Sequence, residues 1–261
     1  MDAAGSYFTR VDTDLYDSSP YTMGPWDPRH QHAGPPSALL GCSIDLAFPR
    51  ENMQVARITV EILGPVPVGR LAVSTRSERT GKSVELLSGS LADVEAGREV
   101  LRASVWRIRT HDIGIEEPVA YETPPGPDGV ESWDAGLPGP AYLNSHELRF
   151  ARGAFTKKGP AAAWARSLVT LIDGEAMPPL ARVLALADSG NGISSVLGPR
   201  KWLFINPDLT VALRRMPEGE WLCLDAQTGI EPHGIGLAES VISDTRGPIG
   251  RGLQTLLIAP R

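Results

Sequence analysis

Apolar residues recur along this chain with two periods, one of which is typical of helices. Within residues 178–192 they fall at positions i, i+3, i+4 and i+7, on one face of a helix. A proline pair opens this segment and Gly-Asn-Gly closes it, as expected at the first turn and at the end of a helix. A second helix is predicted over residues 38–47, after a Gly-Pro-Pro-Ser opening at Gly34, and Pro49 stops it. The apolar face of the first segment comprises Leu180, Val183, Leu184 and Ala187.

Runs of strand-forming residues surround these helices. Turns as short as Gly64-Pro65 and Thr80-Gly81 join the strands of the first half. Parallel strands need a crossover of a dozen or more residues, so these connections favour antiparallel pairing. We therefore expect an α+β fold in which an antiparallel sheet covers a long helix. The predicted strands are residues 7–16, 55–63, 70–78, 83–95, 99–109, 146–155, 201–214, 220–227, 236–243 and 250–258, with 162–170 as a strand or a short helix.

The second half of the chain repeats landmarks of the first. Pro35 and Asp45 are ten residues apart, and so are Pro178 and Asp188. Repeated landmarks in one order indicate duplication of one α+β unit. Residues 113–140 between the halves are rich in Pro and Gly, which predicts a linker or a loop laid over the surface. The expected domains are therefore residues 1–112, the linker 113–140, and residues 141–261. Further matches are Pro67-Val68-Gly69 with Pro217-Glu218-Gly219, and Gly97 with Gly247.

Composition narrows the classes of function. The net charge of −6 leaves no basic footprint for nucleic acid or an anionic membrane. No apolar run approaches the roughly 18 residues of a membrane span. Cys42 and Cys223 are far apart and without metal-ligand spacing, so we expect them to be small buried residues in a reducing compartment. The first residues lack a basic region followed by an apolar one, and we expect a cytoplasmic protein.

Asp188 is the first candidate for chemistry. It follows Leu184 by about one helical turn, which turns its carboxylate toward the buried face and near the unfavourable C-terminal end of a helix. Such a carboxylate is either paired or reactive. Asp45 takes the same position in the first half, so Asp188 alone does not mark a site. On the last strand, however, Gln254 stands where the first half has Ser104, and the pair Asp188 and Gln254 therefore points to the second half.

With these features the sequence resembles the double hotdog acyl-CoA thioesterases, the type II bacterial enzymes, and in its glycine pattern their actinobacterial branch. The resemblance covers nearly the whole chain and depends on order and spacing rather than on one diagnostic motif. It implies two tandem hotdog units, each a long helix wrapped by an antiparallel sheet. The segments that carry it are His32-Ala33-Gly34-Pro35-Pro36-Ser37-Ala38-Leu39-Leu40, Ala187-Asp188-Ser189-Gly190-Asn191-Gly192, Asn206-Pro207-Asp208-Leu209-Thr210-Val211 and Gly250-Arg251-Gly252-Leu253-Gln254-Thr255.

The resemblance also implies a mechanism. Family members use an Asp, a Thr or Ser, and a Gln to place the water that attacks the thioester. Asp188 and Gln254 match the first and last of these, and Asn206 best matches the middle one. Asn, like Thr, can donate and accept hydrogen bonds. The thioester oxygen would be held by a backbone N–H at a helix N-terminus or at Gly192, and no cofactor or metal is expected. Thr210 on the same strand is a substitute for Asn206, and His32 is a possible acid, base or substrate-binding residue.

Other functions stay open at this point. A biosynthetic dehydratase, cyclase or lyase could use the same scaffold with His32 as its acid or base, because a fold does not decide chemistry. A non-catalytic acyl-binding protein is favoured by the absence of the family's Thr. Serine hydrolase chemistry is rejected, since Ser194 and Ser195 lack the Gly-X-Ser-X-Gly pattern. The expected partners are an acyl-CoA or acyl-carrier thioester and a second copy of the chain, as a homodimer or larger assembly.

Overall fold

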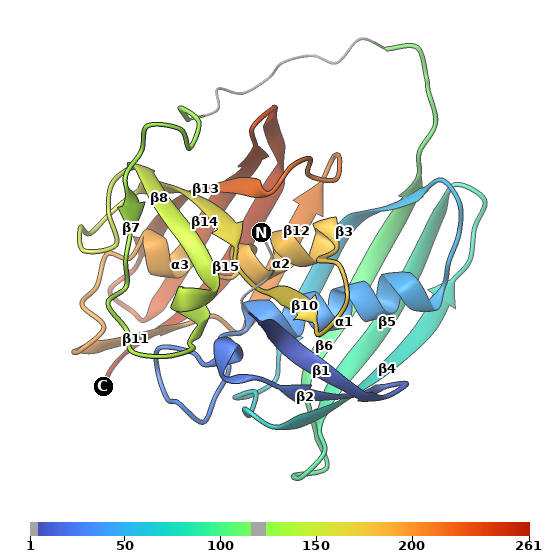
Figure 1. Ribbon diagram of the computed structural model, residues 1–261, viewed down its shortest axis with the longest axis horizontal. Helices are drawn as coiled ribbons and strands as arrows, with labels where there is room; N and C mark the ends of the chain where they lie inside the picture. The colour runs from blue at the N-terminus through green and yellow to red at the C-terminus, as the bar shows by residue number, and fades with distance from the viewer. Residues whose placement is uncertain (1–4, 116–123) are drawn as a thin grey trace.

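The computed structural model describes residues 5–115 and 124–261 (Figure 1). Two segments lie outside the described residues: residues 1–4, on which the expected absence of a basic and then apolar signal segment partly depends, and residues 116–123 of the predicted linker. None of the described helices is long and apolar enough to cross a membrane. The helices are α1 (Gly34–Ala47), α2 (Pro179–Ala187) and α3 (Gly190–Ile193), with short 3-10 turns η1 (Pro20–Thr22) and η2 (Tyr142–Ser145).

One antiparallel ladder joins the two halves through β3 and β12, the strand of each half that lies at their junction, where Thr59 pairs with Thr210. A parallel contact between β1 and β10 joins them a second time. The first half comprises β1 (Ser6–Asp12), β2 (Leu15–Ser18), β3 (Met53–Ile62), β4 (Arg70–Arg79), β5 (Val84–Asp93) and β6 (Arg98–Arg109). The second comprises β7 (Ser132–Trp133), β8 (His146–Arg152), β9 (Ala161–Ser167), β10 (Thr170–Ile172), β11 (Trp202–Ile205), β12 (Asp208–Leu213), β13 (Trp221–Ile230), β14 (Ile235–Asp244) and β15 (Gly247–Pro260).

Each half wraps its sheet around its own helix, so the α+β double hotdog prediction is confirmed. Helix α1 packs on β3 to β6, and α2 packs on β12 to β14. The two helices also lie against each other in the centre of the molecule (Figure 1). Their contact needs glycine, because a Cβ on Gly34 would lie 2.2 Å from Ala185 O and one on Gly41 2.5 Å from Leu184 Cδ1. The N-terminus of α1 therefore meets the C-terminal end of α2.

Four predicted elements are divided in the structure. Residues 7–16 form the hairpin β1–β2 rather than one strand, with a turn in which Thr13 N donates to Asp12 Oδ1 at 2.7 Å. Residues 201–214 are interrupted at Asn206-Pro207, because proline has no N–H to continue the ladder. The helix of residues 178–192 ends at Ala187, and α3 follows as a separate turn. Residues 162–170 form β-structure, as β9 and the start of β10, and no helix.

A Pro-rich stretch covers the outer face of the second sheet. Trp164 is fully buried there and donates from Nε1 to Pro125 O at 2.6 Å. Cys223 packs against the same ring, while Cys42 is buried in the main core, and both thiols are free. That main core runs through both halves without a break, so each unit stabilises the other.

Candidate functional site

The fold buries the carboxylate of Asp188 at the junction of the two helices. The apolar face of α2 is packed in the core, and Asp188, the next residue after the helix, is turned inward and only 4% exposed. The carboxylate faces the end of α1 at which backbone N–H groups point outward. A helix N-terminus favours an anion, which offsets the unfavourable C-terminal end of α2.

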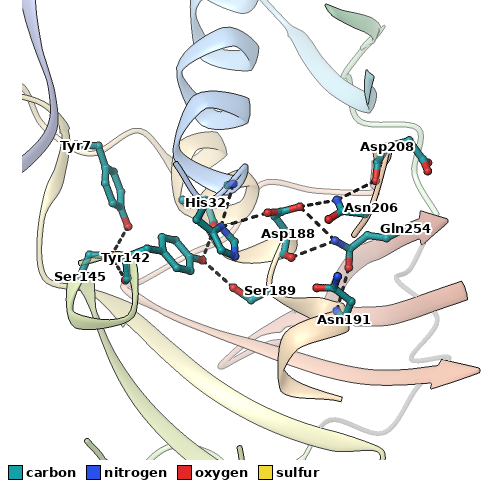
Figure 2. A network of polar contacts seen from close by, with 12 residues as sticks. Tyr7, His32, Tyr142, Ser145, Asp188, Ser189, Asn191, Asn206, Asp208 and Gln254 are labelled. Atoms are coloured by element: carbon teal, nitrogen blue, oxygen red, sulfur yellow. Dashed lines mark hydrogen bonds and ion pairs between the residues drawn. The ribbon is translucent and has the colours of Figure 1, made fainter. Parts of the chain in front are cut away.

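Three side chains from distant parts of the chain meet this carboxylate (Figure 2). Asn206 donates from Nδ2 to Asp188 Oδ1 at 2.8 Å. Gln254 donates from Nε2 to the same oxygen at 3.2 Å and to the backbone oxygen of Asp188 at 3.0 Å. His32 Nδ1 lies 3.2 Å from Asp188 Oδ2. The arrangement holds one carboxylate oxygen with two N–H donors and places an imidazole at the other.

A second ring of contacts fixes the two amides. Gln254 Oε1 accepts from the backbone N–H of Asn191 at 3.0 Å, and Asn206 Nδ2 also donates to Asp208 O at 3.1 Å. Each amide is thereby oriented by a backbone group that can only donate, the N–H of Asn191, or only accept, the oxygen of Asp208. Gly190 allows this approach, because a Cβ there would lie 2.9 Å from Gln254 Oε1.

Burial shifts both titratable groups toward their neutral forms. Burial raises the pKa of Asp188 to about 7, against the hydrogen bonds from Asn206, Gln254 and the backbone of Ala33 and Gly34. Burial, with a smaller contribution from His146, lowers the pKa of His32 to about 3. At neutral pH the imidazole is uncharged and the carboxyl group is near the midpoint of its titration. A carboxylate whose pKa lies close to the working pH suits general base catalysis.

A cavity of about 1020 Å³ opens beside Asp188. Apolar side chains from α2, α3 and the second sheet line its inner part, among them Leu148, Ala163, Leu186, Ile193 and Leu224. Lys157, Lys158, Arg200 and Arg261 also line it, all four of them exposed at the surface. Asp188 is the one carboxylate among the described residues that border it. The site therefore combines an apolar chamber with a buried carboxylate and a cationic border. Its volume is at the upper end for small-molecule pockets.

Two family models match the sequence. Residues 117–258 match the C-terminal domain of acyl-CoA thioesterases, and residues 22–108 match the N-terminal domain. The chain belongs to the acyl-CoA thioesterase family. Membership of this family makes it a thioester hydrolase, and the resemblance stated from the sequence is confirmed. A search of curated proteins matched none to this chain.

Solved structures agree with this family in fold. A candidate thioesterase II from Thermobifida fusca YX is 19% identical, aligns over 98% of this chain and 96% of its own, and has a TM-score of 0.77. A hotdog-fold protein of unknown function from Alicyclobacillus acidocaldarius is 17% identical over 96% and 95%, with a TM-score of 0.73. The acyl-CoA thioesterase II TesB2 from Mycobacterium marinum is 15% identical over 97% and 95%, with a TM-score of 0.64. At such identities the likeness concerns the fold alone.

Within this thioesterase fold, Asp188, Asn206, Gln254 and His32 come together, and two other candidates do not join them. Thr210 pairs with Thr59 across the β3–β12 junction, with 3.1 Å between the hydroxyl oxygens. Gly192 borders the cavity, but its N–H donates to Ser189 O at 3.0 Å.

Sequence reasoning missed Tyr142, which holds His32 in place. The two rings are stacked at 3.6 Å with 6° between their planes. The Tyr142 hydroxyl contacts Ala185 O at 2.6 Å and Ser189 Oγ at 2.8 Å, so the ring is anchored to the end of α2 (Figure 2). Tyr142 follows the Pro/Gly-rich segment, where no periodicity marks inward-facing positions. Its proximity to His32 arises only from the folding of the second half onto the first.

The matching position in the first half is closed by an ion-pair network. Arg107, 2% exposed, donates from Nη1 to Asp45 Oδ1 at 2.9 Å and from Nε to the buried Glu85 at 2.6 Å. The small cavity beside Asp45 measures about 200 Å³. This paired carboxylate differs from Asp188, whose partners among the described residues are uncharged. In the part of the chain that the structure describes, no group of three His, Cys, Asp or Glu residues is placed to hold a metal.

Proposed function

We propose that this chain hydrolyses an acyl-CoA or carrier-bound acyl thioester, with Asp188 as the base that activates water. The observation that carries the proposal is the buried Asp188 carboxylate, held by Asn206 and Gln254 at the wall of an apolar cavity. Such a cavity suits an acyl chain, and the cationic border suits the phosphates of a coenzyme A carrier. We also propose that the chain divides into an N-terminal hotdog unit of residues 1–112, a linker of residues 113–140, and a C-terminal hotdog unit of residues 141–261 that contains the active site.

The reaction needs one water. Asp188 accepts one of its protons while the oxygen adds to the thioester carbonyl carbon. The tetrahedral intermediate then expels the thiolate, which takes the proton from Asp188, so that a carboxylic acid and a thiol result and the carboxylate is regenerated. Asn206 and Gln254 have roles before this step, because they donate to Oδ1 and so direct the remaining lone pairs of the carboxylate. Asn206 thus stands in for the family's Thr.

The test is a panel of acyl-CoA substrates of different chain length, with the released thiol detected by a chromogenic reagent. We expect turnover by the wild-type chain and its loss in Asp188→Ala and Gln254→Ala. Tight binding of acyl-CoA without release of thiol would instead favour an acyl-binding protein. Conversion of a hydroxyacyl or enoyl thioester without release of thiol would favour the dehydratase or lyase alternative, in which His32 would be the acid or base.

Quaternary structure and location extend the proposal. Family members with two hotdog units per chain often pair again through their sheets, so we expect a homodimer or larger assembly. A sedimentation mass equal to the 28.0 kDa of one chain would reject this. The two free, buried cysteines fit a reducing compartment, and we propose the cytoplasm.

A further inference from the structure

The N-terminus of α1 lies beside Asp188 but has few backbone donors to offer a substrate. Pro35 and Pro36 have no N–H. The N–H of Ser37 donates to Ala33 O at 3.0 Å. The N–H of Gly34 donates to His32 Nδ1 at 3.1 Å, and both Ala33 and Gly34 donate toward the Asp188 carboxylate. The place where a helix usually holds an oxyanion is therefore already engaged within the protein.

Several other N–H groups beside Asp188 are engaged as well. On α3, the N–H of Asn191 donates to Gln254 Oε1, and that of Gly192 to Ser189 O. Asn206 Nδ2 and Gln254 Nε2 each donate to two acceptors within the protein. Hydrolysis nevertheless needs a donor where negative charge develops on the carbonyl oxygen.

His32 retains one donor. The imidazole is neutral, so it carries a single proton. Its Nδ1 accepts from Gly34 and lies 3.2 Å from Asp188 Oδ2, which donates to it once Asp188 has taken up a proton, and both contacts leave the imidazole proton on Nε2. Among the described residues Nε2 has no hydrogen-bond partner, and it is not enclosed by protein atoms. The side chain is 15% exposed and borders the cavity, and the stacked Tyr142 ring fixes the plane of the imidazole.

We propose that His32 is a catalytic residue whose Nε2–H holds the thioester carbonyl oxygen and stabilises the oxyanion as water adds. The proton stays on Nε2 throughout, so His32 is an electrophile and not the acid or base. A neutral imidazole acts in this way in triosephosphate isomerase, where it polarises a carbonyl group. The inference depends on the proposed hydrolysis, because it assigns a role in that reaction.

Three substitutions of His32, by Gln, Asn and Phe, distinguish the contribution of the Nε2–H donor from that of the ring. The amide nitrogen of Gln is three bonds from Cβ, as Nε2 is, and that of Asn is two bonds away, as Nδ1 is. His32→Phe keeps a ring to stack on Tyr142 but has no donor. We expect kcat to fall about 100- to 1000-fold in His32→Phe and His32→Asn, as when an oxyanion donor is removed. In His32→Gln the fall should be smaller, so that kcat is at least about tenfold higher than in the other two variants.

The rates are compared with wild type on the best acyl-CoA substrate, with melting temperatures measured for each folded variant. A His32→Gln variant no faster than His32→Phe, or slower than His32→Asn, overturns the proposal. Nitrogen-15 NMR of the wild-type histidines gives a readout apart from activity: we expect the His32 proton on Nε2, and a proton on Nδ1 also overturns it. If wild type releases no thiol while NMR places the proton on Nε2, the proposed function fails and the tautomer assignment stands.

Discussion

Replacing Asp188 by Asn should make the protein more stable at alkaline pH while it removes the catalytic base. The carboxyl group ordinarily titrates near 3.8, and burial raises its pKa to about 7 in the folded protein. The protonated form is therefore the one the fold prefers. The stability it contributes is complete below pH 3.8 and is lost as pH rises through 7.

The magnitude follows from the shift of about three units, since each unit corresponds to about 1.36 kcal/mol between the protonation states. The upper limit at pH 8 is therefore about 4 kcal/mol, and relaxation around the ionised group makes ~2 kcal/mol a realistic gain. The introduced amide resembles the protonated carboxyl group. Its oxygen can accept from Asn206 and Gln254, and its NH₂ can donate to His32 Nδ1.

Urea unfolding at pH 5 and pH 8 measures this effect. We expect wild type to lose stability between the two values and Asp188→Asn to lose much less, so that the variant exceeds wild type at pH 8. The matched control is Asp45→Asn in the first half, which should destabilise the protein because it removes a partner of the buried Arg107. An Asp188→Asn variant that is less stable than wild type at pH 8 would refute the reasoning about the buried carboxyl group.

Further predictions concern activity. In wild type, kcat/KM should rise with pH along a limb of apparent pKa about 7, because only ionised Asp188 accepts the proton of water; a profile flat from pH 5 to 8 would contradict this. Gly190→Ala should lower kcat about tenfold, because the new Cβ would lie 2.9 Å from Gln254 Oε1 and displace the Gln254 amide from its place beside Asp188. Gly192→Ala, where a Cβ meets nothing within 4 Å, is its control and should leave kcat within about twofold. Equal rates for the two alanine variants would remove the evidence that Gln254 must be held in place.

Much of the fold is readable in the sequence because its signals are local. The proline pairs and apolar spacing identified both helices, and the short turns identified antiparallel sheets. The predicted strands 7–16 and 201–214, which are divided in the structure, share a cause. A single polar or proline residue, such as Pro207 or Asp14, changes the chain's direction without breaking the strand-like composition around it.

The site was readable only in part. The repeat singled out Asp188 with Gln254, and the structure brings these two side chains within hydrogen-bonding distance. The contacts of His32 and Tyr142 are different in kind. They join the start of α1 to the end of α2 and to η2, so they depend on how the halves pack. Local periodicity contains no information about such contacts, and neither does it show that Arg107 closes the matching position beside Asp45.

The most direct test of the central claim compares thiol release and substrate binding for wild type and Asp188→Asn at pH 8. The account predicts that wild type hydrolyses at least one acyl-CoA and that Asp188→Asn binds it with similar affinity but releases thiol at least about 1000-fold more slowly. Full hydrolytic activity in Asp188→Asn would contradict the account.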